Sequence, residues 1–420
     1  MFENNGCRVM LFENKKFKTN SISISMVSEL QKETATQNAL LLEVLGRGCE
    51  LFSTSKEISV ELEECFGANL ASNVDKHGDK QVFGFSVSYP ADEFVNANIT
   101  KRLMTLMLNV IFKPNLREGL FVEDFFNQEK ENLRQEIEGL KDDKKDYAHD
   151  RLLNCMFEGE PYSLCELGDL DTLEKLTNQD LYRHYKQLLK SVQIVVLLSG
   201  RFSNKIVEEF SVNLNDILER DIETQDLGKL ALKTPREIFE KTEEFDVTQG
   251  KLEIGFTTET LPSSPDFIPL VVTNAIFGGG MQSKLFTVVR EQESLAYYAV
   301  SAIDKFKGVM FAYAGIDLQH KQKAQELILS QLSKVQNGEI SDFEFSASKK
   351  SIINSLRALG DSLLAEQSFY FNQLLTKSKL SIEEMISEIS EIKIEEVVRV
   401  AKKIKPHTVY FMTEKTGVAL

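Results

Sequence analysis

Residues 173–189 read LEKLTNQDLYRHYKQLL, and residues 389–404 read ISEIKIEEVVRVAKKI. The two segments can be written one above the other without a gap. Each has the apolar spacing of an amphipathic helix, and a strand-like run follows each helix at the same distance. The aligned apolar residues are Leu173 with Ile389, Leu176 with Ile392, and Leu181 with Val397. This agreement indicates an internal repeat.

The repeat extends outward over most of the chain. In the first half, strand-like runs at residues 7–13 and 21–27 precede helical stretches, a strand pair around residues 80–90, more helices and the closing helix and strand. The second half repeats this order from residue 251 to residue 414. Hairpin-like strands alternating with groups of helices predict an α+β fold. We expect two similar domains, each a mostly antiparallel sheet with helices packed on one face.

The domain boundaries follow from composition. Residues 216–246 are rich in charge and poor in sustained apolar periodicity, which is typical of a linker. The sequence therefore predicts an N-terminal domain over residues 1–215 and a C-terminal domain over residues 247–420. A second charged run, KDDKKDYAHDR at residues 141–151, indicates a solvated junction between helices, or alternatively a segment that contacts a partner chain through residues 147–149.

Composition limits the function classes. The chain has 420 residues, of which 42% are hydrophobic and 27% charged, as in an ordinary globular protein. Its net charge of −15 argues against nucleic-acid binding, which needs clustered Lys and Arg. No apolar run approaches the roughly 20 residues that span a bilayer, and the N-terminal stretch lacks the pattern of a signal peptide. With five cysteines and no C-x-x-C pair, we expect reduced thiols and a cytoplasmic protein.

Two predicted helices carry residues that bear on chemistry. The first contains the run Leu40-Leu41-Leu42-Glu43-Val44, in which Leu40 and Val44 lie one turn apart on one face. The second contains Glu129 and Glu136, whose spacing of two helical turns also places them on one face. A core helix and a solvated helix would have the same patterns. No two of the five histidines lie close in sequence, and no Cys–His or Asp–His cluster has ligand spacing.

The second half carries two more features. Gly278, Gly279 and Gly280 precede MQSKLF without the spacing of a nucleotide-binding loop, so they indicate a tight turn with positive φ or a close backbone approach. In VVREQESLAYYAV a helix ends and a strand begins, with Arg290 and Tyr297 seven residues apart. Taken alone, Arg290 would form a salt bridge with a neighbouring glutamate, and Tyr297 would pack in a strand.

Five segments together resemble the pitrilysin/insulinase family of zinc peptidases, specifically its bacterial YmfF-like branch, which lacks the zinc helix. They are ALLLEVLGRG, EKENLRQEIEG, NQDLYRHY, FGGGMQSKLF and VREQESLAY. The resemblance implies the mitochondrial-processing-peptidase-like fold. In active members an H-x-x-E-H helix supplies two zinc ligands and a general base, and a later glutamate supplies the third ligand.

The resemblance assigns roles to these positions. Leu40 and Val44 replace the two histidines, Glu43 matches the base, and Glu136 matches the third ligand, so all four are vestigial and no metal is expected. The stretch from Val44 to Glu136 is longer than in active members. Arg290 and Tyr297 match a pair that contacts the substrate backbone near the scissile bond. Gly279 and Gly280 match a glycine-rich loop that lines the chamber entrance in some non-catalytic members, and a mere turn is the alternative.

These roles imply a chain with no catalytic residues of its own. We expect a non-catalytic subunit of a heterodimeric zinc peptidase, which helps bind and position peptides in a closed chamber. Zinc is then expected only in a homologous partner subunit. The alternative is a structural or peptide-binding protein that keeps the fold without any peptidase role. Whether the isolated chain forms homodimers is left open by the sequence.

Overall fold

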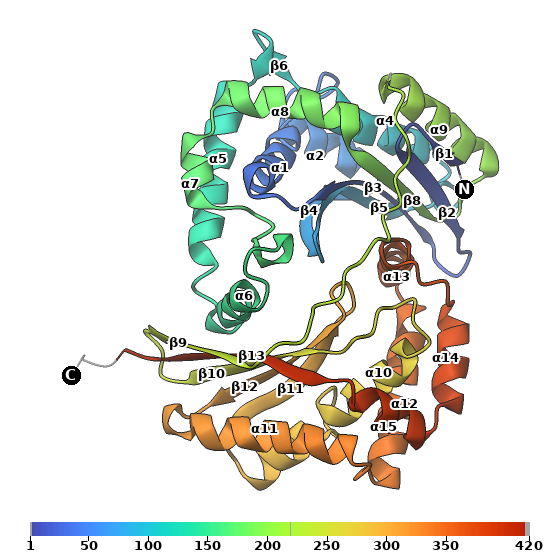
Figure 1. Ribbon diagram of the computed structural model, residues 1–420. Helices are drawn as coiled ribbons and strands as arrows, with labels where there is room; N and C mark the ends of the chain where they lie inside the picture. The colour runs from blue at the N-terminus through green and yellow to red at the C-terminus, as the bar shows by residue number, and fades with distance from the viewer. Residues whose placement is uncertain (1, 219, 416–420) are drawn as a thin grey trace. The chain divides into compact units, whose positions relative to one another are not determined.

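The computed structural model describes residues 2–218 and 220–415 of the chain. Two compact units share these residues, and they exchange segments (Figure 1). The first unit comprises Met1–Gly139, Leu164–Asp226 and Ser362–Phe371, and the second comprises Leu140–Ser163, Leu227–Asp361 and Asn372–Leu420. Helix α13 (Leu363–Thr376) therefore begins in the first unit and ends in the second.

The first unit is built on a six-stranded sheet with the order β1-β2-β8-β3-β5-β4. Its strands are β1 (Phe2–Asn4), β2 (Cys7–Glu13), β3 (Thr19–Glu29), β4 (Asn69–His77), β5 (Lys80–Pro90) and β8 (Gln193–Gly200), with a small separate hairpin of β6 (Leu116–Arg117) and β7 (Leu120–Phe121). Its helices are α1 (Lys32–Leu45), α2 (Ser55–Glu64), α3 (Asp92–Val95), α4 (Ile99–Phe112), α5 (Glu123–Gly139), α7 (Leu170–Lys175), α8 (Asn178–Ser191) and α9 (Asn204–Leu218). Only β2 and β8 pair in parallel.

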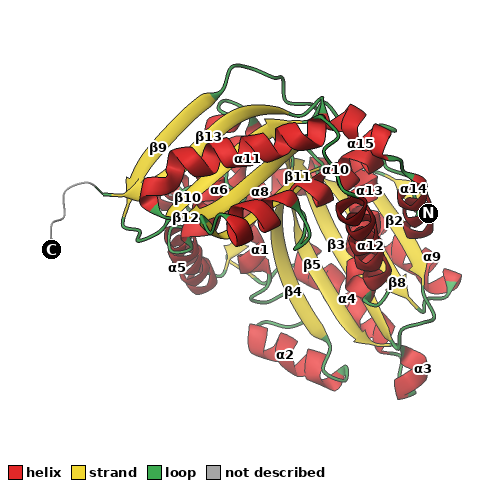
Figure 2. Ribbon diagram, turned by 90° about the horizontal axis from the view of Figure 1, so that it is seen from below, coloured by secondary structure: helices red, strands yellow, loops and turns green. Residues whose placement is uncertain are grey.

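Alternation along the strands decides which face of this sheet carries the core. In the run SISISMVS, Ile22, Ile24 and Met26 are buried in the hydrophobic core, whereas Ser23 and Ser25 are only half-buried on the other face. A one-residue shift in register would exchange these two faces. Figure 2 shows β3, β5 and β4 side by side, with β4 at the edge.

The second unit is built on a five-stranded sheet with the order β11-β12-β10-β13-β9. Its strands are β9 (Phe239–Phe245), β10 (Gly250–Thr257), β11 (Ala296–Asp304), β12 (Val309–Ile316) and β13 (Lys405–Glu414). Its helices are α6 (Lys144–Met156), α10 (Phe267–Phe277), α11 (Lys321–Gln336), α12 (Asp342–Leu359), α14 (Ile382–Glu391) and α15 (Ile394–Ala401), with short helical turns η1 (Pro161–Ser163), η2 (Leu285–Gln292) and η3 (Leu318–His320).

The two sheets have the same topology. In chain order, β2, β3, β4, β5 and β8 of the first unit correspond to β9, β10, β11, β12 and β13 of the second, and they take the same order across the sheet. Each sheet has one parallel pair, β2 with β8 and β13 with β9, and its other pairs are antiparallel. The predicted α+β fold of two similar, mostly antiparallel domains is therefore confirmed.

The closing helices of the two units repeat their burial as well as their order. Leu173 and Ile389 are both 0% exposed, Leu176 and Ile392 are 6% and 8% exposed, and Leu181 and Val397 are both 0% exposed. Leu173, Leu176 and Leu181 belong to the hydrophobic core of the first unit. The three aligned apolar pairs are thus equivalent core positions in the repeat.

Helix α6 makes the second unit different from the first. Ala148, Leu152 and Met156 pack with Phe311 and Tyr410 in a small hydrophobic cluster on the face of the second sheet opposite its other helices. Figure 1 shows α6 and α11 on opposite sides of this sheet. The interpretation of residues 141–151 as a solvated junction was wrong for their second half, because these residues cover a sheet of their own chain.

Residues 216–246 contain regular structure at both ends. Helix α9 ends at Leu218, and β9 covers residues 239–245. β9 pairs in parallel with β13 and forms an edge of the second sheet. In the part of the chain that the structure describes, no helix is long and apolar enough to cross a membrane.

Candidate functional site

Helix α1 carries the first set of predicted site residues. It begins after Gln31, which makes no side-chain cap, and ends at Gly46. Leu40 is 0% exposed and Val44 is 3% exposed, and both belong to the core of the first unit. Hydrocarbon side chains therefore fill the two positions where the resemblance implies imidazoles.

Glu43 lies on the same helix but is not fully buried. Its Oε1 accepts a hydrogen bond from Ser72 Oγ on the edge strand β4 at 3.0 Å. Burial raises the pKa of the Glu43 carboxyl, the Ser72 bond opposes this, and the negative charges of Glu129 and Glu136 raise it further. The structure thus brings together three glutamates that are far apart in sequence.

Glu129 is the buried member of this group. It is 5% exposed, and its Oε1 lies 3.2 Å from Nη1 of Arg47, just beyond the end of α1. Asn132 Nδ2 donates to its other oxygen at 2.9 Å. Arg47 also donates to Gln128 at 2.6 Å and lies over the Phe125 ring. The sequence analysis missed Arg47. The one local indication of its role was that a positively charged residue follows directly after α1.

These residues do not fit a zinc ion. A zinc site needs nitrogen, sulfur or oxygen ligands, and the side chains of Leu40 and Val44 have none. The one buried carboxylate in the group, Glu129, is already paired with Arg47. Across residues 2–218 and 220–415, no group of three or more His, Cys, Asp or Glu side chains is placed to hold a metal ion.

Arg290 and Tyr297 lie in the second unit. Arg290 belongs to η2, a π-helical segment, which is rare and often occurs at functional sites. Its guanidinium lies 4.6 Å from the Phe286 ring centre and 3.7 Å from Glu291 Oε1, and 43% of the side chain is exposed. The local salt bridge that the sequence allowed is therefore present, although its distance is long.

Tyr297 sits at a β-bulge in the edge strand β11. The register with β12 shifts between Ala296 and Tyr298, so Tyr297 has no partner residue in the ladder. Bulges re-aim side chains and are common near functional sites. The Tyr297 side chain is 70% exposed, unlike a tyrosine packed within a sheet. Because β11 corresponds to β4 in the repeat, Tyr297 and Ser72 lie on equivalent edge strands.

The glycine-rich loop lies against β11. Gly278 accepts a hydrogen bond from the Ser301 backbone N–H at 2.9 Å, and a Cβ on Gly278 would lie 2.7 Å from that nitrogen. A Cβ on Gly279 would lie 2.9 Å from the Ala275 Cα. None of the three glycines has a positive φ, so that part of the prediction was wrong and close approach is the reason for glycine here. At the loop tip, Met281 is 76% exposed.

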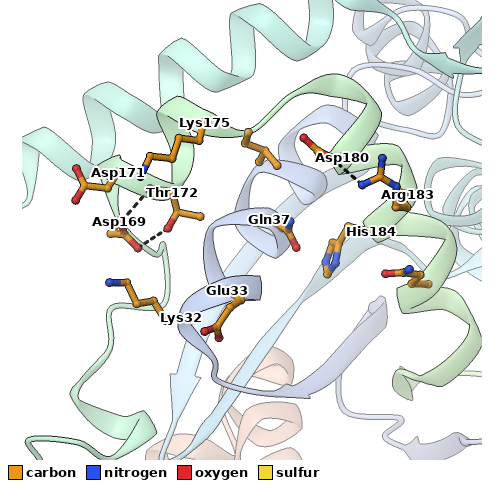
Figure 3. A pocket seen from close by; sticks show the side chains of 12 residues that line it. Lys32, Glu33, Gln37, Asp169, Asp171, Thr172, Lys175, Asp180, Arg183 and His184 are labelled. Carbon is orange, nitrogen blue, oxygen red and sulfur yellow. Dashed lines mark hydrogen bonds and ion pairs between the residues drawn. The ribbon is translucent and has the colours of Figure 1, made fainter.

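A polar cavity of about 650 Å³ lies in the first unit, between α1, α7 and α8 (Figure 3). Figure 3 shows Lys32 and Glu33 at the first turn of α1, and Gln37 facing His184 of α8. Charges of both signs line it, and some are already paired, such as Arg183 with Asp180 at 2.9 Å. The sequence analysis did not find this cavity, because its residues come from separate helices.

A chain of buried amides fixes the His184 ring. Gln81 Nε2 donates to the backbone carbonyls of Ala35 and Glu166, so Gln81 Oε1 accepts from Asn38 Nδ2 at 2.8 Å. Asn38 Oδ1 must then accept from His184 Nε2, at 2.6 Å. Burial lowers the pKa of His184 to about 4, so the ring is neutral at pH 7 and Nδ1 carries the lone pair.

None of the five cysteines forms a disulfide in the described structure. Cys7, Cys49 and Cys65 are buried, and Cys155 and Cys165 are partly exposed. Burial raises the pKa of the Cys65 thiol to about 11, which keeps it protonated and unreactive at neutral pH.

Comparison with known proteins agrees with this geometry. The family described as "Peptidase M16 inactive domain" matches residues 175–352. The "Probable inactive metalloprotease YmfF" of Bacillus subtilis (strain 168) is 28% identical, and the alignment covers 99% of this chain and 97% of that protein. A second protein of that organism, the "Uncharacterized zinc protease YmxG", is 22% identical over 95% of this chain and 94% of its own length.

Solved structures extend the similarity to three dimensions. A conserved protein from Enterococcus faecalis V583 has a TM-score of 0.92 at 27% identity, with 99% of this chain and 98% of that chain covered. A chain of Complex III2 from Candida albicans has the same fold, with a TM-score of 0.73 at 18% identity and coverage of 97% and 94%. The chain is thus a homologue of the M16 zinc peptidases, the pitrilysin/insulinase family, and resembles within it the YmfF-like branch that lacks the zinc motif.

Proposed function

We propose that this chain is the non-catalytic subunit of a heterodimeric zinc peptidase and that it helps to bind and position peptide substrates for a zinc-bearing partner. One observation carries the proposal. Hydrocarbon fills the two ligand positions, Leu40 and Val44, whereas Arg290 and Tyr297 keep polar ends that are open to solvent. The chain has lost the residues that hold a metal and kept those suited to hold a peptide.

The chemistry of Arg290 and Tyr297 supports a peptide-binding role. A guanidinium offers several N–H donors and a phenol offers one O–H donor, and both groups can donate to a peptide carbonyl. The bulge at Tyr297 directs its side chain out of the ladder of β11. An edge strand also has unpaired backbone groups that can align an extended peptide. We propose that Gly279 and Gly280, in the loop next to β11, contribute backbone contacts.

The proposed partner is a homologous chain of similar size with an intact H-x-x-E-H helix. Zinc would be bound by that partner, where it would supply the activated water for hydrolysis. This chain would contribute oriented hydrogen-bond donors, which lower the barrier when the scissile bond is held in one position. We place the assembly in the cytoplasm, a setting that suits five cysteines that form no disulfide in the described structure.

Two substitutions in the mixed complex test the role of this chain. We expect Arg290→Ala to lower kcat/KM for peptide cleavage by at least about tenfold, because a donor to the bound peptide is lost. Tyr297→Phe removes a single hydroxyl and should give a smaller loss. The measurement is cleavage of a quenched fluorescent peptide by the reconstituted pair, with complex formation followed by size-exclusion chromatography.

A matched control is Arg357→Ala on α12, which removes an exposed arginine of the same unit. It should leave both turnover and complex formation unchanged. If Arg290→Ala and Tyr297→Phe also turn over peptide at the wild-type rate, this chain has no role in positioning substrate.

The second candidate is a structural or peptide-binding protein without any peptidase role. The similarity of fold to a chain of Complex III2 favours it, since the same scaffold occurs there in a complex named for no peptidase. Under this alternative the chain binds extended peptides or neighbouring proteins, and no H-x-x-E-H homologue forms a complex with it.

A further inference from the structure

A second cavity, of about 380 Å³, lies in the second unit beside the hairpin of β11 and β12. Its volume is within the range of small-molecule sites, roughly 300–1,000 Å³. It contains none of the residues that the family resemblance singled out. The lining residues are His149 of α6, Ala302 to Phe306 at the end of β11 and its turn, and Phe311 and Tyr313 of β12.

Aromatic rings form much of the wall. The His149 ring lies edge-on to Phe311 and Tyr313, with ring centres 4.9 Å and 5.2 Å apart. Phe306 is 9% exposed and closes the turn. Rings in such edge-to-face contact are rigid and offer large apolar surfaces at little cost in side-chain entropy. The wall therefore suits an apolar or aromatic group of a ligand.

A buried carboxylate behind the cavity orients His149. Glu253 on β10 is 1% exposed, and its Oε2 lies 3.2 Å from His149 Nδ1. Burial raises the pKa of Glu253, and the His149 partner lowers it. The Glu253 carboxyl group at Nδ1 fixes the orientation of the ring. Among the described residues His149 has no second hydrogen-bond partner.

Lys305 contributes an ammonium group that forms no ion pair among the described residues. In the described part of the chain its ammonium group forms no hydrogen bond or ion pair, and its recorded neighbour is the Phe306 ring at 5.4 Å. Burial lowers the pKa of Lys305, and the charge of Asp304 opposes this. The Asp304 carboxylate already accepts from the Tyr162 hydroxyl and from two backbone N–H groups.

Tyr313 adds another donor to the same wall. Its hydroxyl has no hydrogen-bond partner among residues 2–218 and 220–415, and burial raises its pKa, so the phenol remains protonated. Lys305 and Tyr313 thus line one cavity as donors without an acceptor among the described residues. A partly buried cation that forms no ion pair is unfavourable, and an anion bound beside it would reduce that cost.

We propose that this cavity binds an organic carboxylate carried on an apolar or aromatic body. Lys305 and Tyr313 hold the carboxylate, and the rings of His149, Phe306 and Phe311 contact the apolar body. The proposal does not depend on any peptidase role. A free aromatic acid and the C-terminal end of a peptide share this chemistry.

Calorimetric titration of the full chain with 3-phenylpropionate tests the site. The wild-type chain should bind it saturably at one site, and Lys305→Met should weaken binding at least tenfold, because the charge-assisted contact is lost. Lys305→Arg, which keeps the charge, and Lys350→Met, which removes an exposed lysine of α12, should bind within about twofold of wild type. The neutral analogue 3-phenylpropionamide should bind at least tenfold more weakly than the acid.

Two results would overturn the proposal. One is the absence of saturable binding to the wild-type chain, and the other is equal binding to wild type and to a Lys305→Met variant with a wild-type thermal unfolding curve. Competition identifies the source of the carboxylate. If a hexapeptide ending in phenylalanine displaces 3-phenylpropionate, the ligand is a peptide end, and if it does not, the ligand is a free acid. Equal displacement by the C-terminally amidated peptide would show that the carboxylate is not recognised.

Discussion

Arg47 supplies a positive charge beside the glutamates of α1 and α5 in the first unit. Its guanidinium is 3.2 Å from the buried Glu129 carboxylate, which lies close enough to Glu43 to raise the pKa of that carboxyl. Without a cation, Glu129 would be a buried, unpaired charge, which is strongly destabilising. The Glu129 charge is therefore balanced by a side chain of the protein itself.

Arg47→Met tests whether Arg47 balances the buried Glu129 charge. We expect it to lower the free energy of unfolding by about 2–3 kcal/mol, because the Glu129 charge stays buried without its partner. The double variant Arg47→Met/Glu129→Gln should recover most of this loss. Urea denaturation of the three proteins checks the prediction. Arg134→Met, on the exposed face of α5, which also carries Glu129, should lower the free energy of unfolding much less. An effect equal to that of Arg47→Met would contradict the role of Arg47 as the partner of a buried charge.

His184 predicts a pH dependence of stability. Its pKa is about 4 in the folded chain, against 6.5 for the unperturbed group. Between these values the unfolded chain takes up a proton that the folded chain does not. The contribution of neutral His184 to the free energy of unfolding is therefore complete above pH 6.5. It falls as the pH falls and has decreased by about 3 kcal/mol by pH 4.

His184→Gln keeps a donor for Asn38 Oδ1 but does not titrate, so its stability should fall less steeply between pH 6.5 and pH 4. Denaturation at several pH values measures the difference between the two slopes. An NMR titration in which the His184 ring becomes protonated near pH 6.5 would contradict the buried, neutral assignment.

At the scale of elements, the equivalent closing helices predict matched effects in the two units. Leu173→Ala and Ile389→Ala each remove a fully buried side chain at the same place in the repeat. Each should destabilise its own unit by about 2–4 kcal/mol. Glu174→Ala, one residue along on the exposed face, is the control and should change little. Hydrogen exchange resolved by segment can show which unit loosens, and loosening of the opposite unit would contradict the repeat.

Local patterns explain which elements the sequence predicts and which it does not. Strands such as SISISMV alternate strictly and were predicted, whereas β9 reads FEKTEEF, is mostly exposed and has no alternation to detect. In α6 the apolar residues Ala148, Leu152 and Met156 are spaced by four, which was a usable signal for a buried face. The many charged residues in the same segment led instead to the interpretation of a solvated junction.

Contacts between distant segments could not be predicted in the same way. The sequence placed Glu43, Glu129 and Glu136 on two helices, and the structure adds that they are close and that Arg47 neutralises one of them. Glu253 and His149 are 104 residues apart, and no local pattern joins them. The roles of Arg290, Tyr297, Gly279 and Gly280 stay predictions, since only a bound peptide can test them.

At the scale of the whole molecule, both units keep the repeat. Leu40 and Val44, where the resemblance implies metal ligands, are core side chains of the first unit. Histidines at these two positions would place imidazole rings in a packed core. We expect Leu40→His/Val44→His to unfold at lower denaturant than wild type, because buried polar rings would lack partners. Denaturation with and without zinc measures this, and a double variant as stable as wild type without zinc would contradict it.

The most direct test of the central claim is peptide hydrolysis measured together with bound zinc, first on this chain alone and then on its mixture with the most similar H-x-x-E-H homologue of the same organism. The lone chain should contain no zinc and cleave no peptide, and cleavage that a chelator abolishes should begin once the partner is added. Stoichiometric zinc with hydrolysis by the chain alone would contradict the reading of Leu40 and Val44. A silent mixture in which no complex forms would contradict the subunit role and favour the structural alternative.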